Sequence, residues 1–132
     1  MSARQGLDRW HGVLANGSSA QDLAAIIRED AVFHSPVVYT PQRGRAMVVA
    51  YLAAAGQVLG NESFRYVREL VDGKDALLEF DTELDGILVN GIDLIRFDED
   101  GMIADFKVMV RPLKAVNKVW EVMAAQLQAN GG

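Results

Sequence analysis

The sequence contains no cysteine, and it holds only two histidines and three prolines among 132 residues. Without cysteine the chain has no disulfide, no thiolate nucleophile and no cysteine-ligated metal site. Its 13 Lys and Arg residues are outnumbered by 18 Asp and Glu residues, which gives a net charge of −5 and leaves no basic cluster. Because binding to a phosphate backbone needs clustered cations, we expect no nucleic-acid partner.

Long hydrophobic runs are also missing. The longest nearly apolar run, Ala46–Ala55, is about half the length of a membrane-spanning helix. The first ten residues lack the apolar centre of a signal peptide. We therefore expect a cytoplasmic protein that makes no contact with a membrane. No repeat or linker divides the chain, so residues 1–132 are predicted to form one domain.

The sequence lacks the common catalytic motifs as well. It has no phosphate-binding loop, no dinucleotide glycine motif, no His-Glu-x-x-His and no Gly-x-Ser-x-Gly. The two histidines are far from one another and lack the spacing of metal ligands. Asp98, Glu99 and Asp100 precede Gly101 and lack the pattern of a calcium loop, so a hairpin turn is the better interpretation. We expect neither a cofactor nor a metal.

Helical periodicity dominates the first half of the chain. Leu7, Trp10 and Leu14 recur at helical spacing, and Gly17 follows as a stop. Ser19 and Asp22 resemble a capping box. A short strand is predicted at Ala31–Ser35. The remaining apolar positions expected on buried helix faces are Leu23, Ile26 and Ile27 in the second helix, and Met47, Val48, Tyr51, Leu52 and Leu59 in a third.

The second half has the period of β-strands. Asp-Gly pairs, which favour tight hairpin turns, separate four stretches of strand composition. A last helix is predicted at Leu113–Gln128, with Pro112 in or next to its first turn. Helices followed by antiparallel strands indicate an α+β fold. The four predicted strands are Glu62–Val71, Asp75–Leu84, Ile87–Phe97 and Met102–Arg111.

Asp93 is the first candidate for a chemical role. It shares strand parity with Val89, Ile95 and Phe97, so a carboxyl group stands in an otherwise apolar row. Desolvation there would raise its pKa and make it a hydrogen-bond donor or a general acid. An ion pair with an arginine, or a structural role beside Gly91, is an equally good interpretation.

For the other polar residues a structural role is the better interpretation. His11 follows Trp10 on the first helix and can be a surface residue, whereas His34 alternates with Phe33 and Ser35 and should point away from the core. Glu79, Asp81 and Glu83 form an acidic stripe on the wet or subunit-facing side of the sheet. Its predicted cross-strand partners are Arg65, Arg96 or Lys107.

Aromatic side chains can belong either to the core or to the wall of a pocket. We expect Trp120 in the core and leave both interpretations open for Trp10 and Tyr51.

In its order of elements and local patterns the chain resembles the nuclear transport factor 2-like superfamily, in its SnoaL-like and ketosteroid-isomerase-like branch. The segments EDAVFHSPV, RGRAMVVAYL, GIDLIRFDEDGMI and DFKVMVRPL carry the resemblance, which spans Gly6 to about Leu113. It implies a cystatin-like cone, in which a curved antiparallel sheet wraps around the N-terminal helices and encloses a pocket. It also implies a homodimer formed through the sheet.

The resemblance assigns roles position by position. Ketosteroid isomerase uses a carboxylate base with a tyrosine and a protonated aspartate. Asp93 matches the protonated aspartate, Ser35 stands in place of the base and Trp10 in place of the tyrosine. The similar site of limonene epoxide hydrolase needs an arginine where this chain has Gly91. Both catalytic sets are therefore incomplete, whereas the simpler acid–base scheme of SnoaL-type cyclases needs only Asp93.

Three functions follow as hypotheses. The first is a homodimeric pocket protein that binds a hydrophobic small molecule and performs weak isomerase-, cyclase- or dehydratase-type chemistry at Asp93. The second is a ligand-binding module without chemistry, and the third is a dimerisation or partner-binding module. Parity and the resemblance predict that Asp93 shares one pocket with Trp10, Phe33, Ser35, Tyr51, Val89, Phe106 and Val108.

Overall fold

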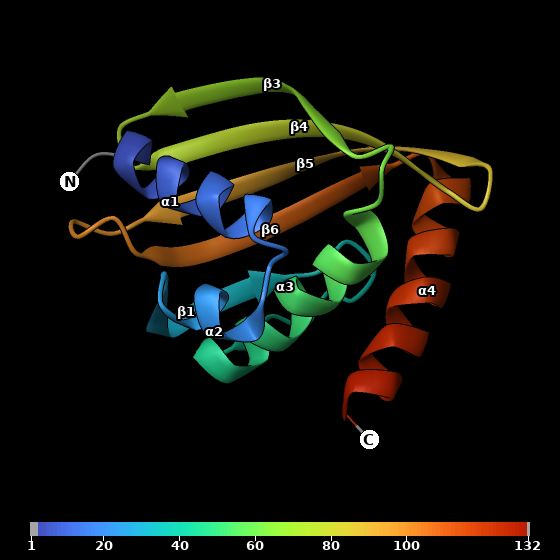
Figure 1. Cartoon of the computed structure of the whole chain (residues 1–132), viewed down its shortest axis with the longest axis horizontal. Coiled ribbons are helices and arrows are strands. Elements are labelled where there is room, and N and C mark those ends of the chain that lie inside the picture. Colours follow the sequence, from blue (N-terminus) through green and yellow to red (C-terminus); the bar gives the residue numbers. More distant parts are fainter. Residues whose placement is uncertain (1–2, 132) are drawn as a thin grey trace.

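Alternation of side chains along the strands gives the sheet a buried inner face and a more exposed outer face. The computed structural model describes residues 3–131, and buried side chains alternate with more exposed ones along β4 (Asp75–Leu84) and β5 (Ile87–Phe97). Six strands form one curved sheet in the order β2–β1–β6–β5–β4–β3 (Figure 1). The other four strands are β1 (Ile27–His34), β2 (Gln42–Arg43), β3 (Arg65–Asp72) and β6 (Ile103–Arg111).

The α+β class is confirmed, and so are the four consecutive antiparallel strands, which pair as β3–β4–β5–β6, but the sheet continues beyond them. β1 pairs parallel to β6, and β2 extends β1 on its other side. Ile27, which we expected on a helix, begins β1 opposite Ile103. The cause is the shortness of α2 (Ala20–Ala24), which is capped by Ser19 as predicted and ends before the β-branched pair Ile26–Ile27.

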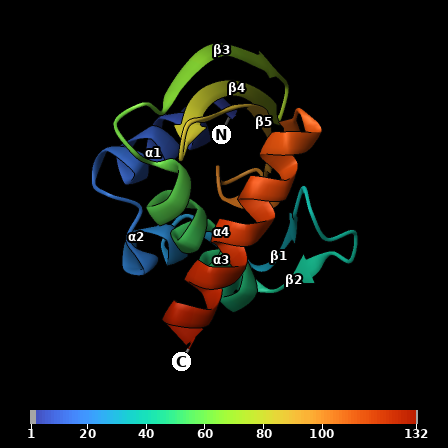
Figure 2. The same ribbon diagram turned by 90° about the vertical axis from the view of Figure 1, so that its right-hand side faces the viewer.

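Three helices cover the inner face of the sheet. They are α1 (Ala3–Ala15), α3 (Arg45–Leu59) and α4 (Leu113–Gly131). α1 buries Leu7 and Trp10 as predicted, and it also buries Val13, whereas Leu14 is only partly buried against the core. Figure 2 shows β3, β4 and β5 arching above the helices, with α3 and α4 below them. Met47 was wrongly expected to be buried: it is 41% exposed, because α3 turns Val48 and Leu52 inward instead.

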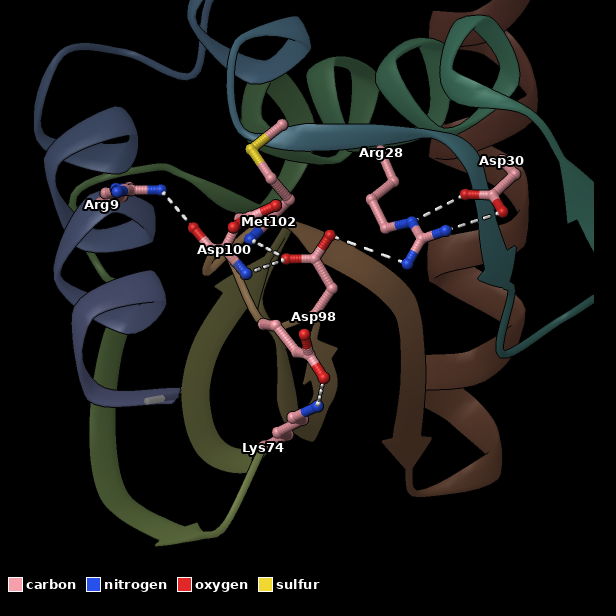
Figure 3. Close-up of polar contacts among 8 residues, drawn as sticks. Arg9, Arg28, Asp30, Lys74, Asp98, Asp100 and Met102 are labelled. Atoms are coloured by element: carbon pink, nitrogen blue, oxygen red, sulfur yellow. Dashed lines mark hydrogen bonds and ion pairs between the residues drawn. The ribbon is translucent and has the colours of Figure 1, made fainter. Parts of the chain in front are cut away.

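The turns between strands follow the Asp-Gly pairs. Asp85 and Gly86 have φ values of 49° and 82°, and two successive positive φ values are typical of a tight hairpin turn. In the β5–β6 turn, Asp98 Oδ1 accepts the backbone N–H groups of Asp100 and Met102 at 2.8 and 2.9 Å (Figure 3). Asp98 also lies 3.7 Å from Arg28, so this acidic segment is a hydrogen-bonded turn, as expected.

Gly91, in the middle of β5, marks a close approach inside the sheet. A Cβ atom there would lie 2.5 Å from Phe80 Cζ and 2.7 Å from the carbonyl oxygen of Met109. Phe80 is buried and stands opposite Gly91 on β4. The ring of Phe80 therefore occupies the space that a side chain at position 91 would need.

Replacing Gly91 by alanine should destabilise the fold, because the Met109 carbonyl is backbone and cannot move aside. We expect a loss of about 1–3 kcal/mol in the free energy of unfolding, measured by urea denaturation. Gly12→Ala is the matched control. Gly12 lies in α1 with nothing within 4 Å of its added Cβ, so the variant should gain roughly 0.5–1 kcal/mol. Equal effects of the two substitutions would contradict the close packing.

Candidate functional site

A cavity of about 680 Å³ lies between the inner face of the sheet and the helices. This is within the usual range for small-molecule pockets, roughly 300–1,000 Å³. Its walls are mostly apolar and come from α1, α3, α4, the segment after β1 and strands β3 to β6.

The structure brings most of the predicted pocket residues together. The seven that line the cavity are Trp10, Phe33, Ser35, Tyr51, Asp93, Phe106 and Val108. Val89 does not line it, although its side chain is buried as strand parity requires. Val89 pairs with Thr82 toward the β4–β5 turn, so it lies farther along β5 than the cavity extends. Parity fixes the face of a strand but not how far along the strand a cavity reaches.

Asp93 carries the most unusual environment in the cavity. Its residue is 7% exposed, and its neighbours on adjacent strands are Leu78 and Val108. The hydroxyl of Tyr66, on β3, donates a hydrogen bond of 2.6 Å to Asp93 Oδ2. The same hydroxyl accepts a hydrogen bond of 3.1 Å from Trp10 Nε1. A chain of two hydrogen bonds thus runs from α1 through β3 to the carboxyl group on β5.

Burial controls the ionisation of this chain. Burial raises the pKa of Asp93 from its ordinary value near 3.8 to about 7, while the hydrogen bond from Tyr66 acts in the opposite direction. Burial and the nearby Asp93 carboxyl raise the pKa of Tyr66 well above its ordinary value. Tyr66 therefore remains a protonated donor, and Asp93 can hold or release a proton near neutral pH. The raised pKa of Asp93 has the direction expected from the sequence.

Tyr66 is the residue that sequence reasoning missed. It lies on the edge strand β3, and β4 separates that strand from β5. Strand parity could have placed its side chain on the inner face opposite Phe80, but not beside Asp93. The contact needs the curvature of the sheet and a long side chain that spans the intervening strand.

The two histidines lie in different surroundings. His11 lines the cavity, pairs through Nε2 with Glu69 of β3, and stands edge-on to the ring of Tyr66 at 5.6 Å. His34 does not line the cavity; it pairs with Asp105 at 2.8 Å. His34 alternates with inward-facing Phe33, as predicted, whereas His11 is more than a surface residue.

α4 supplies one wall of the cavity. Val119, Met123 and Leu127 recur along its inner side and line the space. Trp120, wrongly expected in the core, is 60% exposed and lines the cavity at its edge. Trp120 follows buried Val119 in the helix, so only part of the indole can turn inward.

The acidic stripe of β4 has one of its predicted cross-strand neighbours, since Arg65 stands opposite Asp81. Arg68, rather than Arg65, Arg96 or Lys107, pairs with Glu79 at 3.0 Å. Asn90 donates a hydrogen bond of 2.8 Å to Asp81. A bulge in β3 between Tyr66 and Arg68 shifts the register, so that Arg68 rather than Val67 stands opposite Glu79.

Residues 3–131 contain neither a cluster of metal-ligating side chains nor a membrane-spanning helix. No group of three His, Asp or Glu side chains in this part of the chain is arranged to hold a metal ion. None of its helices is long and apolar enough to cross a membrane.

Comparison with known proteins agrees with this geometry. The profile of the SnoaL-like domain matches residues 7–106. A steroid delta-isomerase from Pseudomonas aeruginosa has a similar structure, with 37% sequence identity, a TM-score of 0.90 and coverage of 97% of this chain and 93% of that chain. No curated protein matches the sequence.

Two further solved structures extend the comparison. An uncharacterised protein with a cystatin-like fold from Silicibacter pomeroyi is 36% identical, with a TM-score of 0.84 over 92% of this chain and 84% of that chain. A nuclear transport factor 2-like protein of unknown function from Mesorhizobium loti is 21% identical, with a TM-score of 0.70 over 83% of this chain and 91% of that chain. The last of these supports the fold alone.

Asp93→Asn should remove a pH dependence of stability. The folded pKa of about 7 exceeds the ordinary value near 3.8, so the folded state holds this proton more tightly than the unfolded chain. The resulting stabilisation is full below about pH 4 and is lost as pH rises through 3.8 to about 7. At about 1.36 kcal/mol per pKa unit, the loss is roughly 4 kcal/mol.

Urea denaturation from about pH 4 to pH 8 would measure this effect. We expect the variant to gain stability relative to the unsubstituted protein as pH rises, because asparagine carries no charge to bury. Asp8→Asn, at an exposed position of α1, is the control for the removal of a carboxyl group outside the cavity. If the difference in the free energy of unfolding between Asp93→Asn and the unsubstituted protein is independent of pH, folding does not raise the pKa of Asp93.

Proposed function

Because this chain belongs to the SnoaL-like family, we propose that its cavity binds a hydrophobic small molecule through a polar group held at Asp93. Asp93 then takes part in acid–base chemistry of the isomerase, cyclase or dehydratase type. The observation that carries this proposal is the Trp10–Tyr66–Asp93 chain of hydrogen bonds at the wall of an apolar cavity.

The chemistry of the wall indicates a carbonyl or hydroxyl group on the ligand. A protonated Asp93 can donate a hydrogen bond to such an oxygen, and the neighbouring phenol and indole keep the carboxyl in place. Among the described residues, Asp93 Oδ1 has no partner in the protein, and the carboxyl faces the cavity. In a low-dielectric cavity a preorganised donor of this kind stabilises negative charge that develops on a carbonyl oxygen.

The similarity to a steroid delta-isomerase supports a rigid, apolar carbonyl compound as the ligand class. Two differences separate this pocket from the ketosteroid isomerase scheme. Ser35, whose Oγ accepts the backbone N–H of Val37, is no carboxylate base. The tyrosine comes from β3 as Tyr66, and Trp10 occupies the corresponding place on α1.

Binding of two ligands of the same shape tests the proposal. 2-Naphthol carries a hydroxyl group, whereas 2-methylnaphthalene carries a methyl group in its place. Titration calorimetry should show that the protein binds 2-naphthol more tightly than 2-methylnaphthalene. Asp93→Leu should lower the ratio of the two affinities at least tenfold, since a hydrogen bond to a charged or buried group is worth about 1–3 kcal/mol.

Val108→Trp, which should fill the cavity, is the second variant and should abolish binding of both ligands. An unchanged preference for 2-naphthol in Asp93→Leu would overturn the role of Asp93. A preference that is present without any turnover of enolisable ketones would favour the non-catalytic ligand-binding module.

We also propose that two copies of the chain pair through the outer face of the sheet. Leu70, Leu77 and Leu94 form one row across β3, β4 and β5 on this face, and Ile92 stands opposite Met109 in the next. Leu70 and Met109 are exposed in the single chain. An isologous sheet-to-sheet contact would cover these apolar rows.

Sedimentation equilibrium measures the oligomeric state directly. We expect twice the chain mass of 14.4 kDa for the unsubstituted protein at micromolar concentration. Met109→Glu should yield the monomer, because the interface would bury a charge without a partner. Leu113→Glu, at an exposed leucine on α4, is the control and should leave the dimer intact. A monomeric unsubstituted protein would contradict the pairing.

A further inference from the structure

Proton transfer on a bound ligand needs an acceptor as well as a donor, and few groups in the cavity can accept a proton. Among the described lining residues, the ionisable side chains are His11, Tyr51, Arg65, Tyr66 and Asp93. Arginine is a permanent cation, and a protonated phenol is a donor at neutral pH. If Asp93 holds the ligand oxygen as a donor, His11 is the acceptor that the cavity offers.

His11 has the surroundings of a positioned base. It follows Trp10 on α1, so it stands next to the residue that begins the hydrogen-bond chain to Asp93. Its ring packs edge-on against Tyr66, with centroids 5.6 Å apart. Its Nε2 pairs with Glu69, which lies on β3 and does not line the cavity.

The pairing fixes which ring nitrogen is basic. An ionised Glu69 accepts the Nε2–H of His11, so the neutral ring carries its lone pair on Nδ1. The same carboxylate stabilises the imidazolium that forms when Nδ1 takes up a proton. A carboxylate that orients a histidine in this way is a recurrent part of acid–base sites.

We propose that His11 is the proton acceptor of this pocket and that Glu69 is its positioning residue. The inference rests on the proposed function, in which Asp93 holds a carbonyl oxygen of the ligand. His11 on α1 then supplies the base that Ser35, which follows β1, cannot provide.

The proposed step is the transfer of a proton from the ligand to His11. His11 Nδ1 removes a proton from the carbon next to the carbonyl, and the C–H electron pair forms a C=C bond. The carbonyl π pair moves to the oxygen, which accepts a hydrogen bond or the proton from Asp93. If the proton on His11 is replaced by a solvent deuteron before transfer back to the same carbon, the ligand exchanges with solvent, whereas transfer to a conjugated carbon gives isomerisation.

Hydrogen–deuterium exchange of 2-tetralone in D₂O, followed by proton NMR, measures this step. The ketone has the ring size of 2-naphthol and an acidic C–H beside its carbonyl. We expect the unsubstituted protein to accelerate exchange and His11→Gln to lower that acceleration at least 100-fold, since a general base contributes about 10²–10⁴. Binding of 2-naphthol should change less than about threefold, because the Asp93 contact remains.

His34→Gln is the matched control, because His34 also pairs with a carboxylate, Asp105, but does not line the cavity. It should exchange at the unsubstituted rate, which would show that a carboxylate-paired histidine outside the cavity does not catalyse exchange. Added imidazole should restore exchange in His11→Ala, a rescue that a structural role would not give. Glu69→Gln should lower exchange and keep 2-naphthol binding.

The measurements of exchange and of 2-naphthol binding test the role of His11 and the proposed function separately. Equal exchange in His11→Gln and the unsubstituted protein, or loss of 2-naphthol binding in step with exchange, overturns the role of His11. That role is also overturned if the unsubstituted protein binds 2-naphthol through Asp93 without accelerating exchange. If 2-naphthol does not bind the unsubstituted protein, the proposed function fails instead.

Discussion

The hydrogen bond from Tyr66 to Asp93 joins β3 to β5 across the strand between them, and the site is organised around it. Such a bond forms only where the sheet curls enough to bring the edge strand over β5. Gly91 contributes to this packing, because its missing side chain leaves room for the ring of Phe80 on the intervening strand. The curvature of the sheet therefore determines both the open space beneath it and the hydrogen-bond partner of the buried Asp93 carboxyl.

The site also shows how an apolar wall changes the chemistry of ordinary residues. Asp93 has no cation beside it among the described residues, so burial dominates and its pKa rises to about 7. His11 and His34 are both paired with carboxylates, yet only His11 borders the cavity. Position relative to the open space, rather than residue type or pairing, separates a chemical candidate from a structural one.

Much of this could be predicted from local pattern, and the failures share a cause. Parity placed Asp93 on the buried face, and Asp-Gly pairs marked the turns, because both depend on neighbours in sequence. Tyr66 was missed, and Trp120 and Val89 were misplaced, because their surroundings depend on the curvature of the sheet and on how far the cavity reaches. Periodicity indicates which side of an element faces inward, but it contains no information on what lies there.

The residues that line the cavity come from two parts of the chain, of which the last helix is one. The match to the SnoaL-like domain ends at residue 106, whereas α4 begins at Leu113 and still supplies Val119, Met123 and Leu127 to the cavity wall. α4 is held to α3 by hydrogen bonds from Gln126 and Asn130 to Gln57. The ionisable lining residues His11, Tyr66 and Asp93 thus lie within residues 7–106, whereas the apolar wall of α4 follows them in the chain. Substitutions on the inner side of α4 would change the length and shape of the ligands that fit without altering these ionisable groups, so selectivity and reactivity can change through separate segments.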